Sequence, residues 1–250
     1  MKLIAIDIGN TSIHLARLDK GHWSHKKRVA TSRHRTDTLK ALKSMLPADK
    51  KAVVVIASVV PQAGKFLKGA IQKLGVKTFL IGSDIRVPMK NLYTNPKQVG
   101  VDRLLNGLAA YHQIKKALIV VDFGTAITFD VVSRKGEYLG GVIAPGIEIS
   151  LEALFNKTAL LPKIRLQHPA NFIGKNTVES IRVGCSVGIG GLCDRVIEAI
   201  EKRHGFKARV VATGGYASFM KRYSQRAQSI REDLIFDGIL LTYKRHSEQA

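Results

Sequence analysis

The chain has 250 residues, of which 45% are hydrophobic, so it is long enough to form one large domain or two lobes with a real core. Forty Lys and Arg against nineteen Asp and Glu give a formal net charge of +21, and no uncharged apolar run is long enough to span a bilayer. These properties argue against a disordered chain and a helical membrane protein, and they predict a cytoplasmic protein with no membrane partner.

The charge of +21 allows two interpretations, which are nucleic-acid binding or a basic solvated surface that attracts anionic metabolites. The basic residues lie in separate short clusters, among them Lys26-Lys27-Arg28, Lys115-Lys116 and Lys244-Arg245. No zinc finger, RNP aromatic motif or long basic arm accompanies them. We therefore expect no specific nucleic-acid recognition, and a secondary anionic partner stays open.

Two cysteines, Cys185 and Cys193, are the only ones in the sequence and stand eight residues apart in an expected helix. No CxxC motif or neighbouring His completes a metal site. We expect buried free thiols.

In the first half of the chain, apolar patterning predicts three strands and a helix, followed by alternating strands and helices. The expected strands cover residues 3–6, 13–16, 23–30, 52–57 and 78–81, and the expected helices residues 39–46, 61–74 and 102–114.

The second half repeats this order. Strands are expected at residues 117–121, 125–132, 137–143 and 208–212, and helices from Ile147, from about Thr177 and from Asp233. The repeat indicates duplication of a lobe rather than a solenoid. We predict an α/β protein with two lobes, residues 1–115 and 116–250, hinged around one cleft.

Each lobe contains an acid followed by a glycine turn, in Asp7-Ile8-Gly9-Asn10-Thr11-Ser12 and in Asp122-Phe123-Gly124-Thr125-Ala126-Ile127-Thr128. Glycine lets successive backbone N–H groups approach phosphate oxygens, Thr11, Ser12, Thr125 and Thr128 add hydroxyl donors, and the carboxylates suit Mg²⁺ or a monovalent cation. Any strand-turn-strand hairpin can hold one such motif. Two at equivalent points of a duplicated lobe predict a phosphoryl-transfer site.

No Walker or Rossmann glycine pattern is present, and Gly188-Ile189-Gly190-Gly191 lies inside a helical stretch, where close helix packing explains its glycines better. Gly214-Gly215 follows a strand and would let a flat adenine or a ribose approach the backbone.

Between the two turns, Asp102 stands at the start of an expected helix just after Gly100. There it could accept the proton of a substrate hydroxyl, while Arg103 could pair with a substrate carboxylate or phosphate. The spacing alone is also explained by an N-capping Asp beside a surface Arg.

Taken together, these motifs resemble the type III pantothenate kinases, which have the actin, sugar-kinase and Hsp70 ATPase fold. The resemblance covers almost the whole chain, and its most specific segments are Val99-Gly100-Val101-Asp102-Arg103 and Gly140-Gly141-Val142-Ile143-Ala144-Pro145-Gly146. It implies two duplicated actin-like (ribonuclease H-like) lobes, each a mixed five-stranded sheet with flanking helices. One departure is Ile127, where a small or hydroxyl residue is expected, and this side chain should face the core.

The resemblance implies ATP-dependent phosphorylation of the primary hydroxyl of pantothenate, the first step of coenzyme A synthesis. The general base would be Asp102, and Asp122 would bind a potassium or ammonium ion, while Asp7 would serve Mg²⁺ through water or phosphate. The positions that match ATP contacts are Asp7, Ile8, Gly9, Asn10, Thr11, Ser12, Ile13, His14 and Thr125. Those that match pantothenate contacts are Tyr93, Gly100, Val101, Asp102, Arg103 and Thr177.

Members of this family are homodimers that complete the substrate pocket at the subunit interface, so the helix after Asp102 is an expected interface element. Two other functions stay open. One is a kinase of the same fold acting on another hydroxyl, and the other is a regulator of this fold whose basic surface binds nucleic acid.

Overall fold

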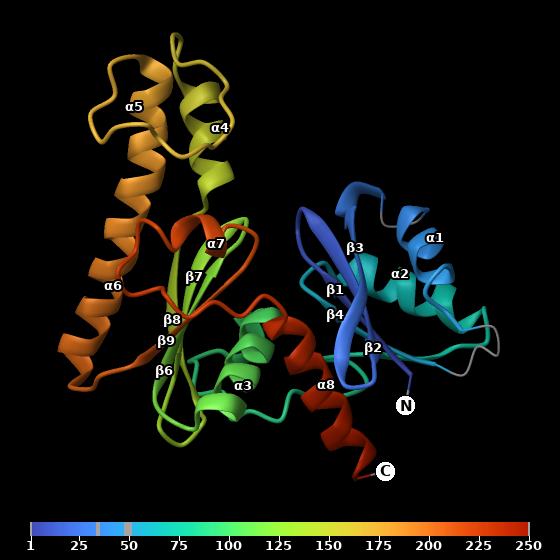
Figure 1. Cartoon of the computed structure of the whole chain (residues 1–250). Helices are drawn as coiled ribbons and strands as arrows, with labels where there is room; N and C mark the ends of the chain where they lie inside the picture. Colours follow the sequence, from blue (N-terminus) through green and yellow to red (C-terminus); the bar gives the residue numbers. More distant parts are fainter. Residues whose placement is uncertain (1, 34–35, 48–51, 250) are drawn as a thin grey trace. The chain divides into compact units, whose positions relative to one another are not determined.

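The computed structural model describes residues 2–33, 36–47 and 52–249, which form two compact units (Figure 1). Unit 1 takes the described residues of Met1–Gln113 and of Asp233–Ala250, and unit 2 is Ile114–Glu232. The expected second lobe of residues 116–250 therefore differs from unit 2 at its end. The last helix, α8 (Leu234–Ser247), belongs to unit 1 because Phe236, Ile239 and Tyr243 are buried there.

Unit 1 is built on a five-stranded mixed sheet in the order β3-β2-β1-β4-β5. The pairs β1–β2 and β2–β3 are antiparallel, and the pairs β1–β4 and β4–β5 are parallel. Its strands are β1 (Leu3–Ile8), β2 (Ser12–Asp19), β3 (His22–Ala30), β4 (Val53–Ser58) and β5 (Lys77–Leu80). Its helices are η1 (Thr31–Arg33), α1 (Asp37–Lys43), α2 (Pro61–Gln72), η2 (Pro96–Gln98), α3 (Val101–Ile114) and α8.

Both faces of strand β1 are buried, as an apolar run in the middle of a sheet requires. Side chains alternate across a strand, so Ile4 and Ile6 join the cluster that contains residues of α1 and α2. Leu3 and Ala5 join a second cluster with residues of α3 and α8. Helix α8 thus helps to cover the face of the unit 1 sheet that carries Leu3 and Ala5.

Unit 2 contains a four-stranded sheet in the order β8-β7-β6-β9, formed by β6 (Leu118–Phe123), β7 (Ala126–Val132), β8 (Tyr138–Pro145) and β9 (Arg209–Thr213). The expectation of five strands is wrong for this lobe within the part of the chain that the structure describes. Where a fifth strand would pair with β9, the chain makes a single parallel bridge between Ile230 and Ala212. The Ala212 N–H donates to Ser229 O at 2.8 Å, and the Arg231 N–H donates to Ala212 O at 2.8 Å.

The helices of unit 2 pack against the face of this sheet that carries Ile119, Val121 and Phe129. They are α4 (Ile147–Lys157), α5 (Thr177–Val183), a π-helical turn η3 (Gly184–Gly188), α6 (Ile189–His204) and α7 (Ala217–Met220). The segments α5, η3 and α6 follow one another without a break, and α4 lies beside α5 (Figure 1). No helix among the described residues is long and apolar enough to cross a membrane.

For this long helical segment, the expectation of buried free thiols is confirmed, and that of close packing at the glycines is confirmed for one glycine and wrong for two. Cys185 and Cys193 are buried and free, and burial raises the pKa of both thiols, that of Cys193 to about 12. Gly190 packs so closely on the backbone of Tyr223 that a Cβ atom would collide with it. Gly188 and Gly191 face open space, so only Gly190 has the packing role.

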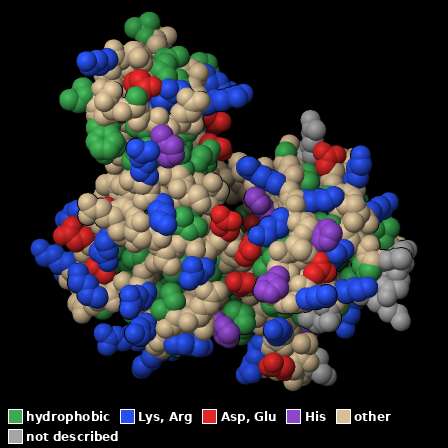
Figure 2. All heavy atoms as spheres, in the orientation of Figure 1, with side chains coloured by type: hydrophobic (Ala, Val, Ile, Leu, Met, Phe, Trp, Pro, Cys, Tyr) green, Lys and Arg blue, Asp and Glu red, His purple; other side chains and the backbone are tan. Residues whose placement is uncertain are grey.

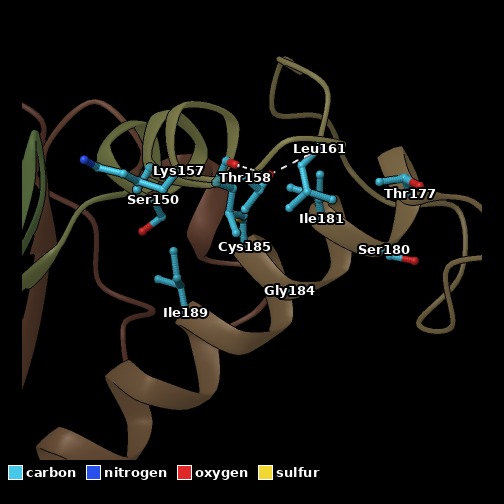
Figure 3. A pocket seen from close by; sticks show the side chains of 12 residues that line it. Ser150, Lys157, Thr158, Leu161, Thr177, Ser180, Ile181, Gly184, Cys185 and Ile189 are labelled. Atoms are coloured by element: carbon cyan, nitrogen blue, oxygen red, sulfur yellow. Dashed lines mark hydrogen bonds between the residues drawn. The ribbon is translucent and has the colours of Figure 1, made fainter.

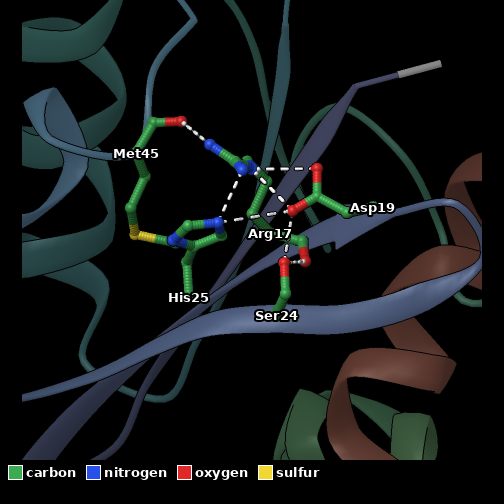
Figure 4. Close-up of polar contacts among 5 residues, drawn as sticks. All are labelled: Arg17, Asp19, Ser24, His25 and Met45. Atoms are coloured by element: carbon green, nitrogen blue, oxygen red, sulfur yellow. Dashed lines mark hydrogen bonds and ion pairs between the residues drawn. The ribbon is translucent and has the colours of Figure 1, made fainter.

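In unit 1, the ribbon of β2 and β3 contains an irregularity held by polar contacts (Figure 4). The register shifts between Leu15 and Arg17, and His25 adopts a φ of 50° on the opposite strand. The Arg17 guanidinium donates to both carboxylate oxygens of Asp19, at 3.0 and 2.9 Å, and to Met45 O at 3.2 Å. These bonds tie the turn after α1 to the sheet.

In unit 2, a buried carboxylate joins the end of α6 to β9 and to the segment before residue 230. Glu201 is 4% exposed and accepts hydrogen bonds from both terminal nitrogens of Arg226, at 3.1 and 2.7 Å. It also accepts from the Ala208 N–H at 2.8 Å and from Lys207 Nζ at 3.2 Å. The Arg226 bonds, with those from Ala208 and Lys207, outweigh burial and lower the pKa of Glu201 to about 2.

We expect Glu201→Gln to lower the free energy of unfolding at pH 7 by about 2–3 kcal/mol. Because the folded pKa lies below the ordinary value of 4.5, this stabilisation is complete above that pH and is lost as the pH falls toward about 2. Urea denaturation at pH 7 and pH 3 should therefore show a smaller difference from the wild type at pH 3.

The control is Glu198→Gln, because Glu198 lies on the same helix but its side chain is 62% exposed. We expect this variant to change stability by less than about 0.5 kcal/mol. An equal loss at both pH values for Glu201→Gln would contradict the ionic role of Glu201.

Candidate functional site

The first glycine turn lies in unit 1 between β1 and β2, at the end of the sheet where β1 stops. Asp7 is half-buried and pairs in register with His14 on β2 and with Ala57 on β4. The Gly9 N–H donates to Ser12 O at 3.0 Å, and a Cβ on Gly9 would lie 3.1 Å from that same oxygen. The exposed residues Asn10 and Thr11 form the tip of this tight turn.

Further contacts fix the flanks of the turn. The Thr31 hydroxyl donates to Gly9 O at 2.7 Å, and the Thr31 N–H donates to Thr11 O at 3.0 Å. Ser12 Oγ and His14 Nε2 share a hydrogen bond of 2.9 Å, and burial together with the charge of Arg28 lowers the pKa of His14. No sequence signal pointed to Thr31, because it follows a basic strand and contacts the turn only through the tertiary fold.

The segment that contains Asp102 lies at the same end of this sheet. A Cβ on Gly100 would be 3.5 Å from Val59 Cγ1, and the Val59 N–H donates to Ile8 O at 3.0 Å, one residue beyond Asp7. Unit 1 therefore brings together the Asp7 turn and the Gly100–Asp102 segment, although they are distant in sequence.

The carboxylate of Asp102 folds back over Gly100 at the start of α3. Its Oδ1 accepts from the Arg103 N–H at 2.9 Å, and it lies so close to Gly100 that a Cβ there would collide with it. Arg103 is only 8% exposed, so the interpretation of a surface Arg beside a capping Asp is wrong for that Arg. Residues 99–103 combine a half-buried acid with a buried guanidinium on a helix terminus.

The loop before α3 places Tyr93 by local hydrogen bonds. The Tyr93 N–H donates to Asn91 Oδ1 at 3.0 Å, and Asn91 Nδ2 donates to Pro96 O at 3.3 Å. Asn95 caps η2 through the Lys97 N–H, at 3.2 Å. These contacts order a loop that has little other secondary structure, and Tyr93 is half-buried in it.

The second glycine turn lies in unit 2 between β6 and β7, where Asp122 is half-buried and pairs with Thr128 and Thr213. Gly214 has a φ of 90° and faces the Asp122 carboxylate, so that a Cβ there would collide with Oδ1 and lie 2.7 Å from Phe123 C. A Cβ on Gly124 would lie 3.3 Å from the same oxygen. Two glycines thus leave one oxygen of Asp122 beside bare backbone.

Packing and a hydrogen bond fix the residues that follow Asp122 in this turn. Gly146 packs on the carbonyls of Gly124 and Thr125 with no room for a side chain. Thr128, expected to be a phosphate donor, instead gives its hydroxyl to the buried Asp130 at 2.9 Å. Ile127 is 1% exposed in the core, which confirms its expected orientation.

Thr177 is the first residue of α5, after Asn176, whose Oδ1 accepts from the Glu179 N–H at 2.9 Å. It lines a cavity of about 680 Å³ within unit 2, between α4 and the α5–η3 segment (Figure 3). The walls are mostly apolar, with Leu154, Ile181 and Cys185 among them. Thr177 thus belongs to unit 2 with Asp122 and Thr125, whereas Tyr93, Gly100, Val101, Asp102 and Arg103 belong to unit 1.

Among the described residues, no group of three or more His, Cys, Asp or Glu side chains could hold a metal ion. A cation at Asp7 or at Asp122 would therefore have fewer than three such side chains from the described residues, with further oxygens from backbone, water or phosphate. Such a ligand set suits hard cations such as Mg²⁺ and potassium rather than zinc.

Solved structures share this fold at low sequence identity. A Baf family protein from Campylobacter jejuni has a TM-score of 0.65 at 22% identity, covering 98% of this chain and 99% of its own. MreB5 of Spiroplasma citri, solved bound to ADP, has a TM-score of 0.55 at 12% identity, covering 99% of this chain and 98% of its own. These likenesses confirm the actin-like ATPase fold.

Sequence comparison is more specific. The type III pantothenate kinase of Anaeromyxobacter sp. (strain Fw109-5) is 41% identical, over 98% of this chain and 99% of its own. That of Geobacter sulfurreducens is 37% identical, over 98% of this chain and 100% of its own. The family model for type III pantothenate kinase matches residues 3–199. The chain therefore belongs to the type III pantothenate kinase family.

Proposed function

We propose that the chain transfers the γ-phosphoryl group of ATP to the primary hydroxyl of pantothenate, the first step of coenzyme A synthesis. Family membership supports the reaction. The observation that carries the assignment of the site is the Asp102 carboxylate, folded over Gly100 at the sheet end that also holds the Asp7 turn. A cytoplasmic location stays a prediction.

The first turn would hold the phosphates of ATP. Gly9 lets the main chain bend tightly, and the exposed tip at Asn10 and Thr11 offers polar groups to phosphate oxygens. Asp7 of unit 1 and Thr125 of unit 2 are further positions that match ATP contacts of the family. Mg²⁺, held through water or phosphate near Asp7, would supply neutralisation of the charge on the transferring group.

Asp102 would act as the general base. As the pantothenate hydroxyl oxygen bonds to the γ-phosphorus, the bond from that phosphorus to the β,γ-bridging oxygen breaks, and the hydroxyl proton passes to Asp102. Arg103 is buried one residue further on, where its guanidinium would bind the pantothenate carboxylate or orient the loop around it. In unit 1, Tyr93, Gly100 and Val101 would also contact pantothenate, and Thr177 of unit 2 is a further position that matches a pantothenate contact of the family.

Asp122 would bind the monovalent cation, potassium or ammonium. The half-buried carboxylate lies against Gly124 and Gly214, so one of its oxygens is held close to main chain that carries no side chain. Carboxylate and backbone oxygens are ligands that hard cations accept. Such a cation would offset charge near the nucleotide.

A homodimer would be completed through unit 2 rather than through α3. Most large apolar side chains that the structure leaves exposed on described residues lie on β8, α4, α6 and the segment 158–176. These exposed side chains are Leu139, Val142, Ile143, Ile149, Phe155, Leu160, Phe172, Ile173 and Leu192. In α3, by contrast, Leu105, Ala109 and Ala110 are buried within the chain. Exposed apolar side chains in this number suit a subunit interface.

A coupled assay of ADP release tests the reaction and the role of Asp102. The wild type should release ADP only when pantothenate is present. Asp102→Asn should lower kcat about 10²–10⁴-fold while leaving the KM for ATP within about twofold, because the base acts on the acceptor hydroxyl.

The control is Asp37→Asn, which changes an acid in the first turn of another helix, α1, and should keep wild-type turnover. Wild-type turnover in a folded Asp102→Asn protein would remove Asp102 from the role of base. No pantothenate-dependent turnover by the wild type would overturn the proposed reaction.

For the cation site, Asp122→Ala should abolish activation by potassium. Gly214→Ala should weaken that activation severalfold, because the added Cβ would displace Asp122 Oδ1. The measurement is the ratio of kcat with and without potassium chloride. Gly215→Ala is the matched control, since a Cβ there has open space, and its ratio should match the wild type. Retained potassium dependence in Asp122→Ala would refute the assignment.

For the dimer, light scattering after size exclusion should give twice the 27.4 kDa of one chain. Phe172→Asp combined with Ile173→Asp should yield monomers with reduced kcat, because a charge on each apolar side chain opposes its burial. Phe66→Asp, on the 38% exposed Phe66 of α2, should leave the dimer intact. A wild-type monomer with full activity would exclude the shared pocket.

A further inference from the structure

The net charge of +21 is not explained by the proposed reaction, and the structure gathers part of it at one place. Eight exposed Lys and Arg side chains lie at one end of the sheet of unit 2, and we call them the basic end. They are Lys115, Lys116, Arg134, Lys135, Lys202, Arg203, Lys207 and Arg209.

The pairing of the strands explains why four separate sequence segments meet there. Leu118, the first residue of β6, pairs with Val132 at the end of β7 and with Arg209 at the start of β9. The turn that carries Arg134 and Lys135 is closed by a hydrogen bond of 2.9 Å from the Ser133 N–H to Glu137 O. Lys115 and Lys116 directly precede β6, so all these segments share one sheet end.

The end of α6 is held to the same place by Glu201. Its carboxylate accepts from the Ala208 N–H at 2.8 Å, just before β9, and from Lys207 Nζ at 3.2 Å. Lys202 and Arg203 follow Glu201 directly in the last turn of α6. The basic end thus includes a helix terminus as well as three strand ends.

Few acidic residues belong to the segments that form the basic end. The segments 115–116, 133–137 and 201–209 contain only Glu137 and Glu201, and Glu201 is buried and bonded to Arg226 at 2.7 Å. Blue Lys and Arg side chains gather over the lower part of unit 2 in Figure 2, where Figure 1 shows α6 ending. This local excess of Lys and Arg favours the binding of an anionic partner.

We propose that the basic end of unit 2 binds nucleic acid through its phosphates, without reading the base sequence. The strand ends from β7 to β9 span about 10 Å, over which a duplex carries roughly six charges. No large apolar side chain of the described segments 115–116, 133–137 and 202–209 is exposed, so they offer nothing that would insert into a lipid surface. Long Lys and Arg side chains at strand ends and at a helix terminus suit phosphate contacts rather than base recognition.

This binding goes beyond the proposed kinase reaction and uses a different part of unit 2. Asp122 lies near the opposite end of β6, roughly 13 Å along the strand from its first residue. Nucleic-acid binding and phosphoryl transfer can therefore be measured and can fail independently.

The test is fluorescence anisotropy of two labelled duplexes of unrelated sequence, titrated with the protein between about 50 and 200 mM NaCl. Both should bind with equal affinity, and the affinity should fall steeply with salt. The variant carrying Arg134→Gln, Lys135→Gln, Lys202→Gln and Arg203→Gln should bind at least tenfold more weakly at low salt. Its slope of log K against log salt should be smaller by about 3–4, near 0.9 for each lost phosphate contact.

A matched control carries Lys40→Gln, Lys43→Gln, Lys65→Gln and Lys73→Gln, which remove the same charge from exposed positions of unit 1. It should keep most of the affinity and the slope, and thermal melts by circular dichroism should show that both variants are folded. Equal weakening by the two variants would overturn the basic end as the binding surface. Affinity that differs between the two duplexes, or binding to phosphatidylserine vesicles without binding to either duplex, would also overturn the proposal.

Discussion

Burial of the central strands on both faces is the constraint on which the rest of the structure depends. In β1 and β6 every residue is buried except an acid near the end, Asp7 in one strand and Asp122 in the other, and both acids are half-buried. A charged side chain is costly inside a sheet, so it lies where the strand stops and the sheet opens. Covering both faces of β1 also requires helices from distant parts of the chain, including α8 from its end.

Neighbouring glycines affect the direction in which a carboxylate of the candidate site points. Two carboxylates lie against glycines that leave no room for a Cβ or only a tight fit, Asp102 at Gly100 and Asp122 at Gly124 and Gly214. The absence of a side chain sets the direction in which each carboxylate points, because a methyl group at Gly100 or Gly214 would occupy its place. Preorganised charge of this kind supports phosphoryl transfer, in which positioning and charge neutralisation carry most of the rate. The two turns that look alike in sequence differ here, since only Asp122 is enclosed by glycines.

In the sheet of unit 2, the candidate cation site and the basic end lie at opposite ends of the strands. In unit 2, the end of β6 that holds Asp122 faces the turn to β7, while its beginning is surrounded by Lys and Arg. Glu201 has a structural part in this arrangement, because one buried carboxylate joins α6, Lys207 and Arg226. The basic residues that are scattered along the sequence thus become a local feature only through strand register.

The sequence by itself determined the strands, most helices and the family, because apolar alternation, helical spacing and glycine motifs are local patterns that a single segment contains. Asp7, Asp102 and Asp122 could be singled out in this way. Only the tertiary structure decided that α8 completes unit 1, that β9 is bridged by Ile230 instead of a fifth strand, and that Thr31 supports the Gly9 turn. It also decided that the Thr128 hydroxyl is bonded to Asp130 and that Arg103 is buried. Each of these depends on packing or hydrogen bonds formed only in the fold, often between residues far apart in the chain, and no local pattern in the sequence records such contacts.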